Sequence, residues 1–138
     1  MLKIEHVGVA VKHLSVSIPL FEKLLNTPCY KTEVVEDAQV NTAFFKKGES
    51  KIELVEAYAP GSVITNFIEK KGEGIHHLAF EVDDIKAEVS RLIDEGFTLI
   101  NEEPTPGADN KIVCFLHPKS TNGVLIELVM ENRHLQPQ

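Results

Sequence analysis

The chain lacks most of the features that mark specialised classes of protein. It has only 2 cysteines among 138 residues, Cys29 and Cys114. Their spacing matches no metal or redox motif, so we expect buried, reduced thiols rather than disulfides. No segment approaches the run of about 18 apolar residues that a membrane-spanning helix needs, and the first residues lack the basic start and apolar run of a secretory signal. These absences favour a cytoplasmic protein with no membrane partner.

Positive charge is scarce as well. Lysine and arginine total 14 against 21 aspartate and glutamate residues, which gives a formal net charge of -7. Nonspecific binding of nucleic acid needs clustered basic residues in excess, so we expect no nucleic-acid partner. The hydrophobic share of 43% and the charged share of 25% are those of an ordinary globular protein. The length predicts a single compact domain.

The hydrophobic pattern predicts the same order of elements twice. Alternation of apolar residues indicates strands and a 3.6-residue spacing indicates helices, and Pro19 fits the first helix only within its first turn. The first set comprises a strand at 3–11, a helix at 15–25 and strands at 30–35, 40–46 and 51–57. After a connection at 58–74 that contains a short helix, the second set comprises a strand at 75–82, a helix at about 84–95 and strands at 98–101, 111–116 and 124–130.

Two stretches of sequence are also repeated in their letters. HVGVAV at 6–11 matches HLAFEV at 77–82, an offset of 77 minus 6, or 71. IELV at 52–55 recurs at 126–129, an offset of 126 minus 52, or 74. A period of this length is too long for a solenoid repeat. We therefore expect one domain, residues 1–138, made of two repeats at about 1–57 and 75–131 that a linker at 58–74 joins.

Matching positions of the two repeats carry a histidine and a glutamate. His6 and His77 lie on the first strand of each repeat, and Glu53 and Glu127 lie on the last. Two imidazoles and two carboxylates suit a divalent metal ion such as cobalt, nickel, zinc or manganese. A lone strand histidine is more often structural than ligating, and a lone glutamate in IELV more often faces solvent. The doubled placement favours inward-facing metal ligands.

Strand parity distinguishes His77 from its neighbour His76. Successive side chains of a strand point to opposite faces, and His76 falls on the apolar face that should pack against a helix. His77 falls on the other face beside the small residue Ala79, as His6 falls beside Gly8. Small neighbours leave room for a ligand, so parity selects His6 and His77.

Four further polar residues are weaker candidates for the site. Glu36 and Asp37 precede the strand that begins near residue 40 and could supply another carboxylate, although a solvated acidic turn explains them equally well. Lys119 and Ser120, in the loop before the last strand, could bind substrate, and capping of that loop is an equally good explanation.

Four stretches of the chain are similar to a known family. They are HVGVAV at 6–11, KIELVE at 51–56, KKGEGIHHLAFEVDDI at 70–85 and FLHPKSTNGVLIEL at 115–128. On these the chain resembles the vicinal oxygen chelate (glyoxalase/bleomycin resistance/dioxygenase) superfamily and, within it, the methylmalonyl-CoA epimerase family. The resemblance implies an α+β fold in which two βαβββ modules form a cupped, open, eight-stranded β-barrel-like sheet around a metal site. It also implies a homodimer.

The resemblance extends to the residues of the site. It assigns the metal to the two histidines and two glutamates named above, although some epimerases have glutamine at the position of Glu53. Family members also carry a base ahead of the third strand, commonly in a Glu-x-Gly-Val context. Here the text is EDAQV at 36–40, which aligns Asp37 with the base and leaves Glu36 as the alternative.

The function that the resemblance implies is epimerisation of methylmalonyl-CoA at C2. A proton leaves the carbon with the help of the metal ion, an enolate forms, and a proton returns on the other face. Glu127 would serve one face and Asp37 or Glu36 the other. The partner would be a small acyl-CoA, and cobalt is the first choice of ion. The alternatives are glyoxalase I, with the same fold and metal set, and a non-enzymatic small-molecule-binding member of the superfamily.

Overall fold

The structure, a computed structural model, describes residues 1–132 of the chain. Within that range it has eight strands, three α-helices and one 3-10 helix, Pro118–Ser120. The helices are α1 (Leu14–Leu25), α2 (Val63–Lys71) and α3 (Ile85–Asp94). The strands are β1 (Lys3–Ala10), β2 (Lys31–Val35), β3 (Val40–Lys47), β4 (Ser50–Ala57), β5 (Gly74–Glu81), β6 (Thr105–Pro106), β7 (Lys111–Leu116) and β8 (Ile126–Glu131). None of the described helices is long and apolar enough to cross a membrane.

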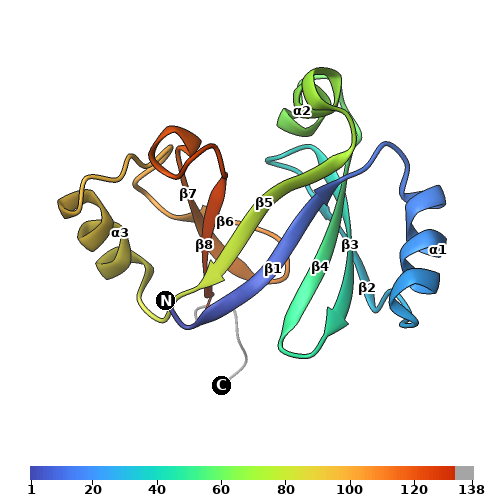
Figure 1. Ribbon diagram of the computed structural model, residues 1–138, viewed down its shortest axis with the longest axis horizontal. Coiled ribbons are helices and arrows are strands. Elements are labelled where there is room, and N and C mark those ends of the chain that lie inside the picture. Colours follow the sequence, from blue (N-terminus) through green and yellow to red (C-terminus); the bar gives the residue numbers. More distant parts are fainter. Residues whose placement is uncertain (133–138) are drawn as a thin grey trace. The chain divides into compact units, whose positions relative to one another are not determined.

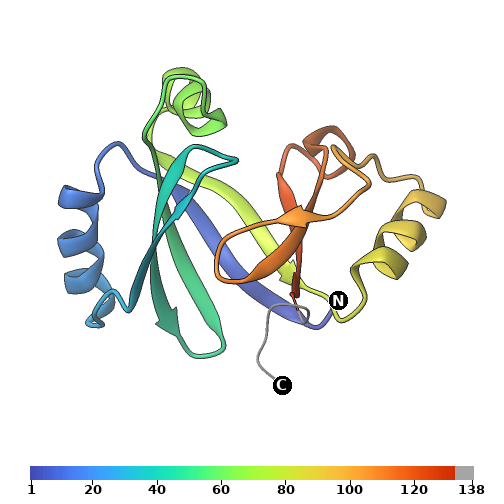
Figure 2. The same cartoon turned by 180° about the vertical axis from the view of Figure 1, so that it is seen from behind.

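The hydrogen-bonded order of the strands repeats the same scheme twice. The order is β2-β3-β4-β1 followed by β5-β8-β7-β6 (Figures 1 and 2). β1 pairs with β4 in parallel, as β5 pairs with β8, and the remaining pairs within each set are antiparallel. The predicted α+β class with eight strands is therefore confirmed.

The chain divides into two compact units. The first unit is His6–His76, and the second combines Met1–Glu5 with the residues from His77 onward. The strands β1 and β5 each contribute residues to both units, since the division falls within them. The boundaries predicted for the two sequence repeats stay a prediction.

In the first unit, α1 and α2 pack against opposite faces of the strands, α2 only at one end of its face (Figure 1). α1 packs on the face that carries Val11, Phe45 and Leu54. Its first backbone N–H, at Leu14, donates to Glu56 Oε2 at 2.9 Å, which satisfies one of the free donors of a helix start. α2 packs through Ile64, Phe67 and Ile68 against the opposite face, which carries Ala10, Val40 and Val55. That opposite face is the one to which His6 belongs by strand parity.

Pro19 contradicts one expectation about α1. The helix begins at Leu14, so Pro19 lies beyond the first turn rather than in it. Proline has no N–H to donate and leaves the carbonyl of Ser15 without its helical partner. Ser15 and Pro19 are both exposed, so water can satisfy that carbonyl and the helix continues.

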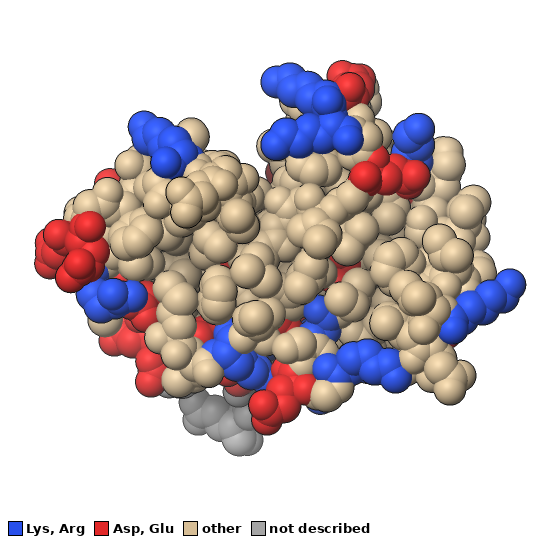
Figure 3. Space-filling view, in the orientation of Figure 1, with Lys and Arg blue, Asp and Glu red and all other residues tan. Residues whose placement is uncertain are grey.

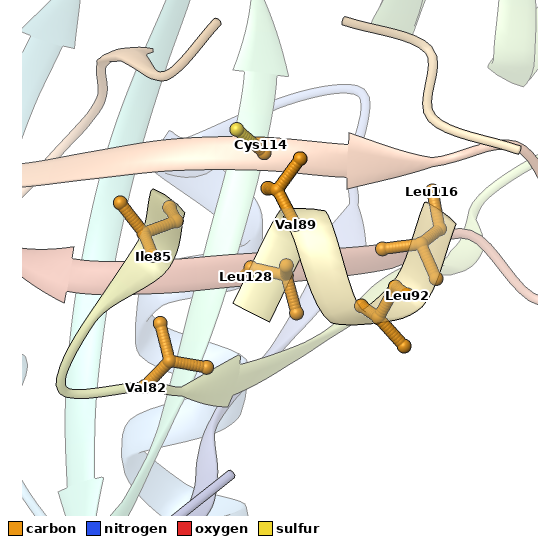
Figure 4. Packing of buried hydrophobic residues seen from close by; sticks show 7 residues of the cluster. All are labelled: Val82, Ile85, Val89, Leu92, Cys114, Leu116 and Leu128. Carbon is orange, nitrogen blue, oxygen red and sulfur yellow. The ribbon is translucent and has the colours of Figure 1, made fainter. Parts of the chain in front are cut away.

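In the second unit, α3 forms the core with β7 and β8. Its buried residues Ile85, Val89 and Leu92 face Leu116 and Leu128 (Figure 4). Asp84 caps the helix, because its side chain accepts the N–H of Ala87 at 3.1 Å. The predicted helix at about 84–95 is confirmed.

The strand predicted at residues 98–101 is wrong. Leu99 makes a single antiparallel bridge to Leu116, and β6 lies further along the chain, at Thr105–Pro106. The side chain of Asn101 ends the pairing. Its Oδ1 accepts the N–H of Phe115 at 3.4 Å and its Nδ2 donates to the carbonyl of Glu103 at 2.9 Å. The side chain of Asn101 thus accepts a hydrogen bond that a backbone carbonyl would accept in a continued strand, and the backbone after it leaves the sheet.

Candidate functional site

The first unit holds a buried histidine and glutamate in contact. His6 Nε2 lies 3.3 Å from Glu53 Oε1, and each residue is 6% exposed. The parallel register of β1 and β4 sets Gly8 opposite Glu53. Because Gly8 has no side chain, the carboxylate can reach along β1 to the imidazole two residues away.

The second unit holds the same arrangement. His77 Nε2 lies 3.1 Å from Glu127 Oε1, and the two residues are 6% and 7% exposed. The parallel register of β5 and β8 sets Ala79 opposite Glu127. The small residue two positions after the histidine therefore faces the glutamate in both units, and the sequence repeat is also a repeat of register.

A phenylalanine accompanies each pair, and our reading of the sequence missed both. Phe44 lies opposite Glu53 in the β3–β4 ladder, and Phe115 lies opposite Glu127 in the β7–β8 ladder. The Phe115 ring meets the ring of His77 edge-on, with centroids 6.2 Å apart. The signal was present in the letters, since 115 minus 44 is 71, the offset that relates the histidines.

His76 and His77 have different surroundings, as parity predicts. The ring of His76 packs edge-on against Phe67 of α2, with centroids 4.9 Å apart. His77 is buried and contacts Glu127. His76 is therefore part of the packing of α2, whereas His77 belongs to the buried polar pair.

The chemistry of each pair fits a divalent metal ion. Neutral imidazole nitrogen and carboxylate oxygen are both donors that such ions accept. An ionised carboxylate buried this deeply needs a partner of opposite charge or a metal ion to offset its lost hydration. Each unit thus offers one nitrogen and one oxygen donor from buried positions.

The acidic turn, which we define as residues 36–39, joins β2 to β3 in the first unit. Glu36 and Asp37 are exposed, and Gln39 has a left-handed backbone with φ of 55°. Ala38 packs against the cluster that contains Ala10 on the His6 face of the sheet. The turn therefore lies at the edge of the face that carries the first His–Glu pair.

Lys119 and Ser120 lie in the 3-10 helix before β8. The Ser120 hydroxyl donates to the carbonyl of His117 at 3.0 Å and accepts the N–H of Thr98 at 3.3 Å. These bonds give Ser120 a role in holding the loop. The Lys119 side chain is exposed, and its backbone N–H donates to His117 Nδ1 at 3.1 Å.

Lysine side chains gather over α2 (Figure 3), whose last turn carries Lys70 and Lys71. The Lys71 ammonium lies 5.8 Å from the ring centroid of Phe67. The same helix also carries Glu69, and acidic side chains lie beside the lysines in Figure 3, so the charge on this surface is mixed. Within it, the two lysines are the groups that would attract an anionic ligand.

Comparison with known proteins identifies the family. Residues 5–115 match the model of the Glyoxalase/Bleomycin resistance protein/Dioxygenase superfamily. The chain is 39% identical over 127 residues to the mitochondrial methylmalonyl-CoA epimerase of Dictyostelium discoideum, covering 91% of this chain and 76% of that protein. It is 37% identical over 128 residues to the ethylmalonyl-CoA/methylmalonyl-CoA epimerase of Cereibacter sphaeroides, covering 91% of this chain and 96% of that protein.

A solved structure extends the similarity to the fold. The structure of a methylmalonyl-CoA epimerase in complex with methylmalonyl-CoA and NH4+ matches with a TM-score of 0.92 and 31% identity. The match covers 99% of each of the two chains. The chain therefore belongs to the glyoxalase/bleomycin resistance protein/dioxygenase superfamily and, within it, to the family of the methylmalonyl-CoA epimerases.

Proposed function

We propose that this protein is an enzyme that inverts the C2 centre of methylmalonyl-CoA. The observation that carries the proposal is the buried His–Glu pair that occurs once in each unit, with the same register and the same neighbouring phenylalanine. Two epimerases of this family are 39% and 37% identical to the chain, and another, at 31% identity, shares its fold. A related structure contains methylmalonyl-CoA itself.

We assign one divalent metal ion to the four side chains of the two pairs, His6, Glu53, His77 and Glu127. When bound, such an ion acts as a Lewis acid that lowers the cost of negative charge on the thioester oxygen. Cobalt is our first choice, and nickel, zinc and manganese suit the same donors. Of these four assignments, Glu53 is the one that the family supports least, because some epimerases have glutamine at this position.

The protein's own carboxylates move the proton. Inversion needs one group to remove a proton from C2 and another to return a proton on the opposite face. We assign Glu127 to one face and an acid of the turn at residues 36–39 to the other, with Asp37 ahead of Glu36. Glu127 is buried whereas the turn acids are exposed, so the two bases work in different surroundings.

The remaining assignments concern substrate binding, the oligomeric state and the location in the cell. Lys119 and Ser120 are proposed to contact the acyl-CoA, and the lysines of α2 to attract its phosphates. A homodimer and a cytoplasmic location belong to the same proposal, as predictions from the sequence.

The decisive experiment follows the C2 proton. Cobalt-loaded protein is incubated with methylmalonyl-CoA in deuterated water, and deuterium at C2 and the ratio of the two epimers are measured over time. We expect rapid incorporation of deuterium together with loss of stereochemical purity. The hemithioacetal of methylglyoxal and glutathione is assayed in parallel.

Two outcomes would overturn the proposal. Turnover of the hemithioacetal alone would make the protein a glyoxalase. Silence with both substrates, in protein shown by elemental analysis to contain metal, would point to a binding role within the superfamily.

A further inference from the structure

Ser62 is buried at a junction between α2 and the acidic turn. The residue is 2% exposed and stands at the N-cap of α2. Its hydroxyl accepts the N–H of Ile64 at 3.2 Å and donates to the carbonyl of Ala38 at 2.9 Å. One hydroxyl group therefore serves the helix start and the turn at the same time.

The bond to Ala38 falls in the middle of the acidic turn. Ala38 directly follows Asp37, and the turn is closed by the N–H of Gln39, which donates to the carbonyl of Glu36 at 3.1 Å. The next carbonyl, that of Gln39, accepts the N–H of Tyr58 at 3.0 Å. Two successive carbonyls of the turn are thus held by the segment that leads from β4 into α2.

Figures 1 and 2 show the turn between β2 and β3 beside α2 from opposite sides of the molecule. Side-chain packing joins them too, because Ala38 and Ile64 belong to one apolar cluster. Most of this contact is apolar and weakly directional. The hydroxyl of Ser62 supplies a directional bond that fixes where the turn backbone stands relative to the helix.

We infer that Ser62 is a positioning residue for the proton-transfer acid of the turn. The inference rests on the proposed function, since it assigns Ser62 a part in that reaction. We assign Ser62 no contact with the substrate; its hydroxyl holds the carbonyl of Ala38, next to Asp37, and thereby the position of the turn acids relative to the His6 face. A displacement of about 1 Å in a reacting group can cost about 100-fold in rate, so loss of this bond should reach the chemistry.

The test uses the relation between exchange and inversion. With two bases, damage to one base slows inversion in both directions. Exchange of the C2 proton with retained configuration persists in the epimer that the intact base deprotonates. A purely structural defect lowers exchange and inversion together, because it lowers the amount of active protein.

The variants are Ser62→Ala, Ser62→Gly and Ser62→Thr in the full metal-loaded chain. Alanine removes both hydrogen bonds, whereas glycine keeps most of the N-cap preference and removes the bond to the turn. Threonine keeps the hydroxyl. Asp84→Ala is the matched control, because it removes the N-cap of α3 without touching the turn.

We expect the alanine and glycine variants to lose about 10-fold to 100-fold in inversion rate while exchange persists in one epimer. The Ser62→Thr variant should have the same ratio of exchange rate to inversion rate as the parent protein. Asp84→Ala should also keep this ratio, despite a loss of thermal stability similar to that of the Ser62 variants. If exchange and inversion fall equally in the Ser62 variants, Ser62 is only structural and the inference is wrong. Absence of any exchange in the parent protein would instead overturn the proposed function, and this inference with it.

Discussion

The first and second units carry equivalent His–Glu pairs on corresponding strands. They differ in the turn that leads into the third strand of each repeat. At an offset of 71, the turn at residues 36–39 corresponds to residues 107–110. The backbone agrees at the last residue of the turn, since φ is 55° at Gln39 and 56° at Asn110, but Asp109 is also left-handed, with φ of 60°, whereas its counterpart Ala38 is not. The carboxylates are not, since Glu36 and Asp37 correspond to Gly107 and Ala108.

A backbone bond that holds this turn to the residue after the last strand of each repeat is also repeated. Tyr58 donates its N–H to the carbonyl of Gln39 at 3.0 Å, and Asn132 donates to the carbonyl of Asn110 at 3.1 Å. The duplicated scaffold thus keeps this one backbone bond, whereas the acidic residues of the turn differ. Metal-type donors occur in both units, whereas an acidic pair in this turn occurs only in the first.

This difference has a chemical meaning for an enzyme that acts on two faces of one carbon. A symmetrical donor set suits a bound ion, but two bases on opposite faces need not be alike. We therefore expect substitutions in the second unit's pair and in the first unit's turn to produce complementary defects.

The largest effect should come from Glu127→Gln compared with Glu53→Gln. The two glutamates are equivalent in the repeat, yet only Glu127 is assigned to proton transfer. With metal content checked by elemental analysis, Glu127→Gln should lower inversion by about 10²-fold to 10⁴-fold, and Glu53→Gln far less. Normal exchange and inversion in metal-loaded Glu127→Gln would remove Glu127 from its role.

The next effect distinguishes the two acids of the turn. Asp37→Asn and Glu36→Gln are made separately, and the one that alters the base should lower inversion by about 10²-fold to 10⁴-fold. The surviving exchange should appear in the epimer opposite to the one that survives in Glu127→Gln. Parent behaviour in both single variants and in the double variant would exclude the turn from catalysis.

The fold and the candidate residues could be predicted where two-residue periodicity and duplication act together. Parity alone put His77 on a different face from His76, and the repeat selected Glu53 and Glu127 from many acidic residues. The prediction of a strand at residues 98–101 failed because a side chain there makes the hydrogen bond that backbone pairing would make. Asn101 ends a short apolar stretch by bonding to Phe115, which no pattern of apolar residues reveals.

The neighbours of the pairs were missed for a different reason. Phe44 and Phe115 look like ordinary core residues in an apolar strand, and only the register of the ladders shows that each lies opposite a buried glutamate. Ser62 was missed because its bond to Ala38 links residues 24 positions apart in sequence. Such contacts depend on tertiary packing rather than on local pattern.

The smallest effect tests a buried position that differs between the units. At the offset of 71, Cys114 of the second unit corresponds to Ala43 of the first, and both residues are fully buried. Burial, together with the negative charge of Glu103, raises the pKa of the Cys114 thiol from 9.0 to about 11. The unfolded chain therefore releases this proton at lower pH than the folded protein does.

Stability from Cys114 should be fully present below pH 9 and decline as the pH rises toward 11, by on the order of 2 kcal/mol. Cys114→Ala makes the second unit copy the first and removes this contribution, although the smaller side chain costs packing energy at every pH. Other groups titrate in the same range, so the measure is the difference in free energy of unfolding between parent and variant, from urea denaturation at pH 8 and pH 10.5. That difference should shrink at the higher pH; a constant difference would mean that the thiol ionises alike in the folded and unfolded states.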